Sequence, residues 1–96
     1  MRKKTSKMIS DGREDLEVEY ILESRPACLE GCAYTAYDFA VICKNRNTGA
    51  VERAAIEDAE DDAERAEQLY HTIVECEVLP ATLGDILEDY VAARSA

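Results

Sequence analysis

The residues with the widest chemical repertoire are four cysteines, at positions 28, 32, 43 and 76. Four thiolates would complete a tetrahedral zinc site, but Cys32 and Cys43 bracket an extended segment, which separates them by roughly 30 Å or more at about 3.3 Å per residue. We therefore expect no metal site, and we interpret Cys43 and Cys76 as small core residues. Cys28 and Cys32 form the one pair in a predicted loop, so a thiol-based metal or redox sensor stays open as an alternative.

Acid-base and nucleophilic catalysis find little support in this chain. His71 is the single histidine, so any Cys-His pair would have to use it. No serine stands in a Gly-x-Ser-x-Gly setting, and no glycine-rich loop could hold a phosphate. The sequence therefore predicts no catalytic residue, no cofactor and no enzymatic activity.

Charge is unevenly distributed along the 96 residues, which hold 11 basic and 21 acidic side chains and carry a net charge of -10. Residues 1–13 contain five basic residues and one acidic residue, whereas residues 14–96 contain six basic and twenty acidic residues. An acidic body repels phosphate backbones and anionic membranes, so we expect no direct nucleic-acid binding and no membrane association. The expected partner is a protein with a basic surface.

Hydrophobic alternation predicts a sheet in the first part of the chain. The most apolar segment, Tyr34–Lys44, is typical of a central strand, and Leu16–Glu23 alternates as a half-buried strand with an acidic outer face. Ala50–Ile56 predicts a third strand, and Thr5–Ile9 a short fourth strand at the edge. Pro26 and Gly31 lie in the stretch 24–33, which we expect to be a connecting loop.

From Asp58 onward the apolar period becomes helical. Asp58 is the expected N-cap of a first helix, and Thr82 with Asp85 resembles a capping box that opens a second helix. The apolar stripe expected on the second helix consists of Leu83, Ile86, Leu87, Tyr90 and Val91.

These elements predict an α+β fold, an antiparallel meander of three to four strands packed against two C-terminal helices. Residues 1–13 are expected to be a basic N-terminal segment, either a tail or a weak edge strand, and residues 14–96 a single α+β domain. We expect a cytoplasmic protein, because the chain shows neither a secretory signal nor a run of about 18 apolar residues.

Three segments carry a resemblance: Leu16–Ser24, Tyr34–Val41, and Leu79–Leu83 with the residues that follow to Tyr90. Together they resemble a family of small uncharacterised proteins from anaerobic Gram-positive bacteria, a domain of unknown function. The resemblance covers the chain from about Leu16 to Val91. It implies a cytoplasmic α+β protein with no assigned activity, and it carries no catalytic or binding residues.

The functional hypothesis is a small acidic protein-interaction or regulatory module. Its binding surface is expected to combine an acidic helix face with an acidic strand face, formed by Glu60, Glu64, Glu67 and His71 and by Glu17, Glu19 and Glu23. Mimicry of nucleic acid by regularly spaced carboxylates is a second alternative. Pairing of two copies through a sheet edge is compatible with each of these hypotheses.

Overall fold

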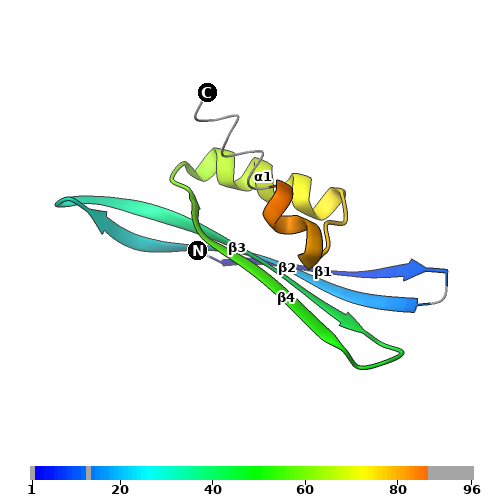
Figure 1. The fold of residues 1–96 in the computed structure, drawn as a ribbon. Helices are drawn as coiled ribbons and strands as arrows, with labels where there is room; N and C mark the ends of the chain where they lie inside the picture. The colour runs from blue at the N-terminus through cyan, green and yellow to red at the C-terminus, as the bar shows by residue number, and fades with distance from the viewer. Residues whose placement is uncertain (1, 13, 87–96) are drawn as a thin grey trace.

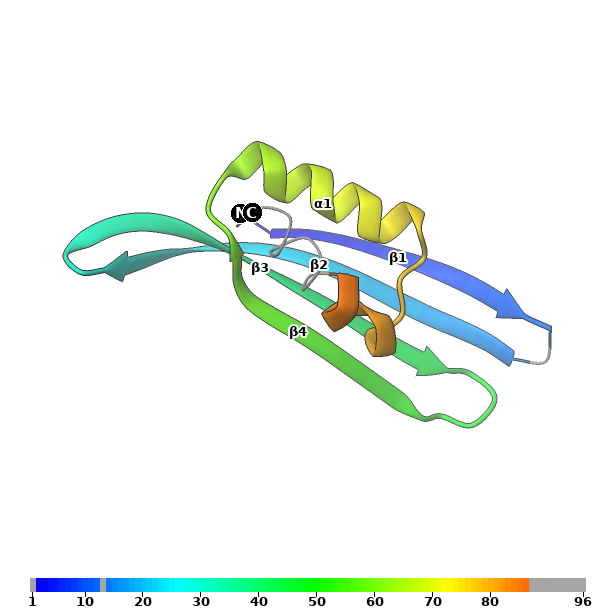
Figure 2. The same ribbon diagram turned by 45° about the horizontal axis from the view of Figure 1, so that its top comes forward.

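A computed structural model describes residues 2–12 and 14–86 and shows a sheet followed by helices. The elements are β1 (Arg2–Asp11), β2 (Glu14–Leu29), β3 (Cys32–Asn45), β4 (Val51–Glu60) and α1 (Ala63–Glu75). Residues 80–86 form the described part of a second helix. The strands pair antiparallel in the order β1-β2-β3-β4, and both helices lie on one face of the sheet (Figure 1, Figure 2). The predicted fold class is therefore confirmed.

The basic N-terminal segment forms edge strand β1, which is longer than the predicted Thr5–Ile9. It pairs with β2 from Arg2 opposite Glu23 to Asp11 opposite Glu14. The Lys7 ammonium donates a hydrogen bond to the Val74 carbonyl of α1 at 2.8 Å. The contact with α1 and the pairing with the longer strand β2 stabilise β1 beyond the residues that its own alternation predicts.

β2 and β3 form one long hairpin, so the prediction of a connecting loop at 24–33 is wrong. Pairing runs without interruption from Leu16 opposite Asn45 to Leu29 opposite Cys32. The turn is only Glu30-Gly31, and both residues have positive φ, at 51° and 80°. Pro26 is tolerated because β1 has already ended its pairing at Glu23, so the proline lies at a free edge.

The core lies between the sheet and the helices. Cross-strand neighbours on β2 and β3 point toward α1 and are buried in the pairs Val18 with Cys43, Tyr20 with Val41, and Leu22 with Phe39. From α1, the buried side chains are Ala66, Leu69, Tyr70 and Ile73. The predicted alternation of β2 and the apolar stripe of α1 thus meet in a single layer.

The predicted start of the first helix at Asp58 is wrong, because β4 continues to Glu60. Asp58 has a left-handed backbone with φ of 54°, and its N–H donates to the Asp38 carboxylate at 2.7 Å. This contact holds Asp58 in the sheet, at an irregularity in the β3–β4 register. The N-cap is Asp62, whose carboxylate accepts a hydrogen bond from the Arg65 N–H at 3.0 Å.

The second helix begins at Pro80, and not at the predicted capping box of Thr82 and Asp85. The Leu79 carbonyl accepts hydrogen bonds from the N–H groups of Thr82 and Leu83 at 3.0 and 3.1 Å. Proline suits the first helical position, because its missing N–H would have no partner there. Leu83 is buried and Ile86 half-buried as predicted, and the rest of the predicted stripe lies outside the described residues.

Candidate functional site

The structure separates the two acidic groups that the sequence analysis combined into one surface. Glu64, Glu67 and His71 lie on α1, above the sheet. Glu17, Glu19 and Glu23 alternate with the buried residues of β2 and therefore point to the opposite side. We call that side, which no described element covers, the open face (Figure 1). The two acidic groups consequently belong to two different surfaces.

Glu60 does not lie on the helix face, which corrects the sequence prediction. It is the last residue of β4 and only 1% exposed. Its Oε1 atom accepts hydrogen bonds from the N–H groups of Asp61 and Asp62 at 2.9 and 3.2 Å. Glu60 therefore organises the turn between sheet and helix, a role for which the sequence offers no signal beyond its proximity to the helix start.

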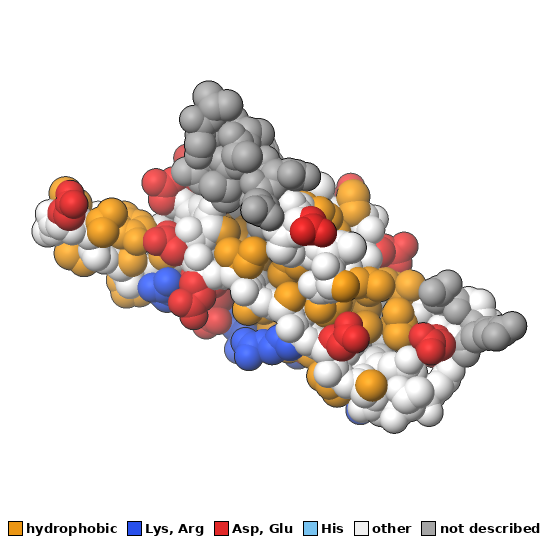
Figure 3. Space-filling model, in the orientation of Figure 1, with side chains coloured by type: hydrophobic (Ala, Val, Ile, Leu, Met, Phe, Trp, Pro, Cys, Tyr) orange, Lys and Arg blue, Asp and Glu red, His pale blue; other side chains and the backbone are white. Residues whose placement is uncertain are grey.

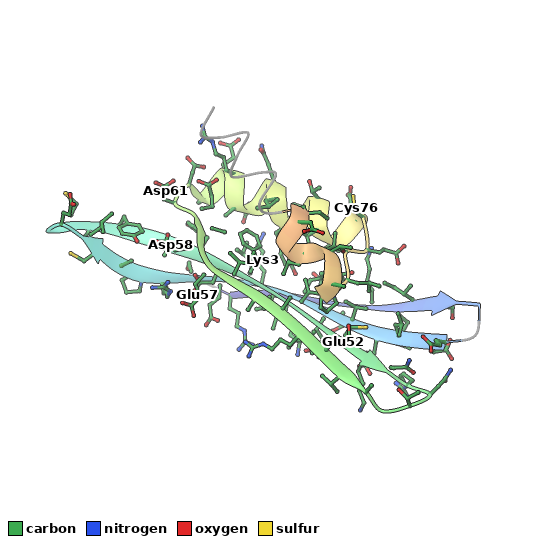
Figure 4. All side chains as sticks on the ribbon, in the orientation of Figure 1. Lys3, Glu52, Glu57, Asp58, Asp61 and Cys76 are labelled. Atoms are coloured by element: carbon green, nitrogen blue, oxygen red, sulfur yellow. The ribbon has the colours of Figure 1, made fainter. Side chains whose placement is uncertain are left out.

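The acidic face of α1 is partly neutralised by the N-terminal strand. The Lys3 ammonium lies 2.7 Å from the Glu67 carboxylate, and this hydrogen-bonded ion pair lowers the pKa of Glu67. The His71 ring is exposed and contacts Tyr70 edge-on, with centroids 6.1 Å apart. The carboxylates of Glu57, Asp58 and Asp61 lie near the junction of β4 and α1, as labelled in Figure 4.

An apolar strip crosses the middle of the open face. Ile21 of β2 lies opposite Ala40 of β3, and Ala40 lies opposite Ala55 of β4. Ile42 continues the strip along β3, two residues after Ala40. Ile21, Ala40 and Ile42 are half-buried and Ala55 is exposed, although all four face away from the core.

Charges of both signs border this strip. Lys4 pairs with Glu19 at 3.2 Å and Arg46 with Glu17 at 3.5 Å. At the other end, Glu23 lies directly across from Asp38, so two like charges face each other on neighbouring strands. The Asp38 carboxylate is shared by the N–H of Asp58 and the guanidinium of Arg25, which donates to it at 2.9 Å.

The Arg25–Asp38 ion pair lies at the end of the open face nearer the turn between β2 and β3. The hydrogen bond and the charge of Asp38 raise the pKa of Arg25 above its ordinary value. Glu23 is exposed and lies directly across from Arg2 on β1, whose opposite charge offsets its repulsion from Asp38. Glu23 and Glu57 are both exposed and line one groove on the open face, where a basic group from solution would meet two carboxylates.

Grooves on the open face are small. One of about 270 Å³ is lined by Glu17, Glu19, Ile42, Lys44 and Val51. A second of about 120 Å³ lies over Ile21, Ala40 and Arg53. Both are below the range of about 300 to 1,000 Å³ that is usual for small-molecule sites. The shape of this face suits a protein surface better than a small ligand.

The end of the β2–β3 hairpin projects beyond α1 as an arm, which the sequence analysis missed (Figure 1, Figure 3). The arm carries Cys28 and Cys32, both exposed, and Leu29, which is 65% exposed. Cys32 pairs with Leu29 and Cys28 with Ala33, so the pleat directs the two thiols to opposite faces of the arm. A disulfide between them would require the hairpin to open.

The other two cysteines divide between core and surface. Cys43 is buried as predicted, but the prediction that Cys76 is a core residue is wrong, because it is exposed at the C-cap of α1 (Figure 4). Within residues 2–12 and 14–86, no three side chains of His, Cys, Asp or Glu are grouped so that they could hold a metal ion. In the same part of the chain, no helix has the length and apolarity required to cross a membrane.

Comparison with known proteins assigns no activity to this architecture. The model of one family, described as "Family of unknown function (DUF6514)", matches residues 2–93. No curated protein and no solved structure matches the chain. The resemblance to a family of unknown function is thus confirmed, while the expected bacterial origin and cytoplasmic location stay predictions.

Proposed function

Since the chain belongs to this family of unknown function, we propose a role from its geometry: a protein-interaction module that binds a partner through the open face. The observation that carries the proposal is the apolar strip of Ile21, Ala40, Ile42 and Ala55 on the side of the sheet away from the helices. A complementary surface would bury these side chains at the centre of an interface and leave the charges at its rim.

The proposed partner carries basic side chains. Glu23 and Glu57 are exposed and line the same groove of the open face, so a lysine or arginine of the partner would find two carboxylates to pair with there. The net negative charge of residues 14–96 would also accelerate association with a basic protein. This attraction should weaken as salt rises, since the charges are exposed.

The two alternatives gain less support from the geometry. Mimicry of nucleic acid needs a row of negative charges, whereas basic Lys4, Lys44 and Arg53 lie among the acids of the open face. A sensor that closes a disulfide between Cys28 and Cys32 is disfavoured by the opposite directions of their side chains. The proposed function therefore rests on the open face alone.

Two variants and one matched control test the proposal. Glu23→Lys changes the charge of the open face, and Ile42→Lys places a cation in its apolar strip. Glu75→Lys makes the same charge change on the exposed surface of α1, on the other side of the sheet. Immobilised protein is used to isolate a partner from extract of the source cells, and the affinity of each variant for that purified partner is then measured by calorimetry at low and high salt.

The proposal expects both open-face variants to weaken binding by at least about tenfold, which corresponds to about 1.4 kcal/mol. Glu75→Lys should bind as the unmodified protein does. If Glu75→Lys abolishes binding and Glu23→Lys leaves it intact, the partner site lies on the helix side and the proposal is wrong.

A further inference from the structure

The sheet has two edge strands, and only one of them is protected against pairing. On β1, three lysines interrupt the edge, and each is held by a contact within the chain. Lys3 binds Glu67, Lys4 binds Glu19, and Lys7 donates to the Val74 carbonyl. A row of lysines is a common protection of an edge strand, because self-pairing would bring like charges together.

The edge formed by β4 lacks this protection. Its regular part runs from Val51, paired with Lys44, to Ile56, paired with Phe39. Its other edge has no partner strand within the described residues, and the segment 51–57 contains neither lysine nor proline. Val51 is 60% exposed, and Ala55 in the middle of the strand is exposed as well. Such an edge presents unpaired N–H and C=O groups to another strand.

We propose that two copies of this chain pair antiparallel through β4 and form one continuous sheet. A twofold axis perpendicular to the sheet at Ala55 places Arg53 of each copy directly opposite Glu57 of the other copy. It also places Ala54 opposite Ile56, two half-buried apolar side chains on the helix side. Directly opposed residues of antiparallel strands point to the same face, so both ion pairs form on the open face.

On the open face, the charges of Arg53 and Glu57 select this register over its neighbours. Centring the axis on Arg53 would oppose two guanidinium groups, and centring it on Glu57 would oppose two carboxylates. With the axis at Ala54 or Ile56, neither Arg53 nor Glu57 lies opposite a residue that carries the opposite charge. Only the register centred on Ala55 satisfies Arg53 and Glu57 together, and each such cross-strand pair is favourable.

The dimer is independent of the proposed function, because it requires no partner other than a second copy. An axis perpendicular to the sheet keeps both helix layers on one side and joins the two open faces into one surface. Pairing of β1 from one copy with β4 of another would behave differently, since a head-to-tail contact continues beyond two copies. The size of the assembly distinguishes the two arrangements.

The test is sedimentation velocity of the purified full chain over a wide concentration range, without any added protein. Glu57→Arg and Arg53→Glu each place like charges across the interface, and the double variant restores both pairs with reversed sign. Glu75→Arg and Arg65→Glu are the matched controls, because they change the same charges at exposed positions of α1.

We expect a dimer whose dissociation constant rises at least about tenfold in either single variant, since two cross-strand pairs are lost together. The dissociation constant of the double variant should lie within about threefold of that of the unmodified protein. Both control variants should have the same dissociation constant as the unmodified protein. A monomer at every concentration, oligomers larger than two, or a double variant as weak as the single ones would each overturn the proposal. A dimer, together with partner binding that Glu23→Lys and Ile42→Lys leave intact, would instead count against the open-face function alone.

Discussion

Two tyrosines in the core are predicted to respond in opposite directions to the same substitution. Tyr20 is fully buried, and its hydroxyl has no hydrogen-bond partner in the described structure. Tyr70 is buried beside it, and its hydroxyl donates to the backbone carbonyl of Tyr20 at 3.1 Å. The Thr5 hydroxyl lies 2.6 Å from the Tyr70 oxygen and completes the chain of contacts.

The magnitudes follow from the cost of leaving a buried polar group without a partner. That cost is about 1–3 kcal/mol, and Tyr20→Phe removes it. The oxygen-sized void left behind costs a few tenths of a kcal/mol at about 24 cal/mol per Å³. We therefore expect Tyr20→Phe to raise the free energy of unfolding by about 1 kcal/mol, which is about 4–8 °C in Tm for a chain of this size.

Tyr70→Phe has the opposite sign, because it removes two hydrogen bonds. At about 0.5–1.5 kcal/mol each, their loss should lower the free energy of unfolding by about 1–3 kcal/mol. Urea denaturation followed by circular dichroism measures both variants against the unmodified protein. The reasoning is refuted if Tyr20→Phe destabilises the protein by about 1 kcal/mol or more, because its hydroxyl must then have a favourable partner.

Alkaline pH gives an independent measurement of the same group. Burial, and then the charges of Glu77 and Cys43, raise the pKa of Tyr20 from 10.0 to about 12. The proton therefore leaves the unfolded chain first, so this contribution to stability is complete below pH 10 and is lost as the pH rises toward 12. The Tyr20→Phe variant should lose less stability over that interval than the unmodified protein does.

Three further predictions concern Glu23 on the open face, Glu60 at the end of β4 and Cys43 in the core. Glu23→Lys should change the free energy of unfolding by less than about 0.5 kcal/mol in urea denaturation, because the attraction gained to Asp38 is offset by repulsion from Arg2; a change of about 1 kcal/mol or more would contradict the registers of β1, β2 and β3. Glu60→Ala should cost about 1–3 kcal/mol in thermal unfolding, since it removes two part-buried hydrogen bonds of about 0.5–1.5 kcal/mol each, whereas Glu60→Gln keeps an acceptor and should cost less. In maleimide labelling followed by mass spectrometry, Cys43 should react slowest, because burial and the charge of Glu52 raise its thiol pKa; equal rates at all four thiols would refute this. The fast-reacting thiols should be Cys28, Cys32 and Cys76.

Part of this architecture could be predicted from local pattern alone. The alternation in Leu16–Glu23 identifies both the strand and the face that it buries, because side chains along a strand point to alternate sides. The helical period around Ala66, Tyr70 and Ile73 likewise identifies the stripe that packs on the sheet. These signals repeat within a few residues, so they need no knowledge of the partner surface.

The misplaced boundaries have a different origin, since each depends on a contact distant in sequence. Pro26 favours a loop over residues 24–33, but it is accommodated in β2 because β1 does not extend beside it. Asp58 is a favourable helix cap by residue type, but its N–H is bound to Asp38, twenty residues earlier on β3. Propensity describes what a residue prefers alone, and these tertiary hydrogen bonds outweigh it.

The candidate site shows the same division between sequence and structure. The sequence by itself determined that Glu17, Glu19 and Glu23 share one face of a strand and that Glu64, Glu67 and His71 share a helix, because the backbone periods require it. Only the packing of the helices on the sheet places the two groups on opposite sides and brings Lys3 to Glu67, and only the strand order leaves β4 as an edge without a partner strand in the described part of the chain. Those outcomes depend on which face the helices cover, a choice made by burying the larger apolar surface and not by any single segment.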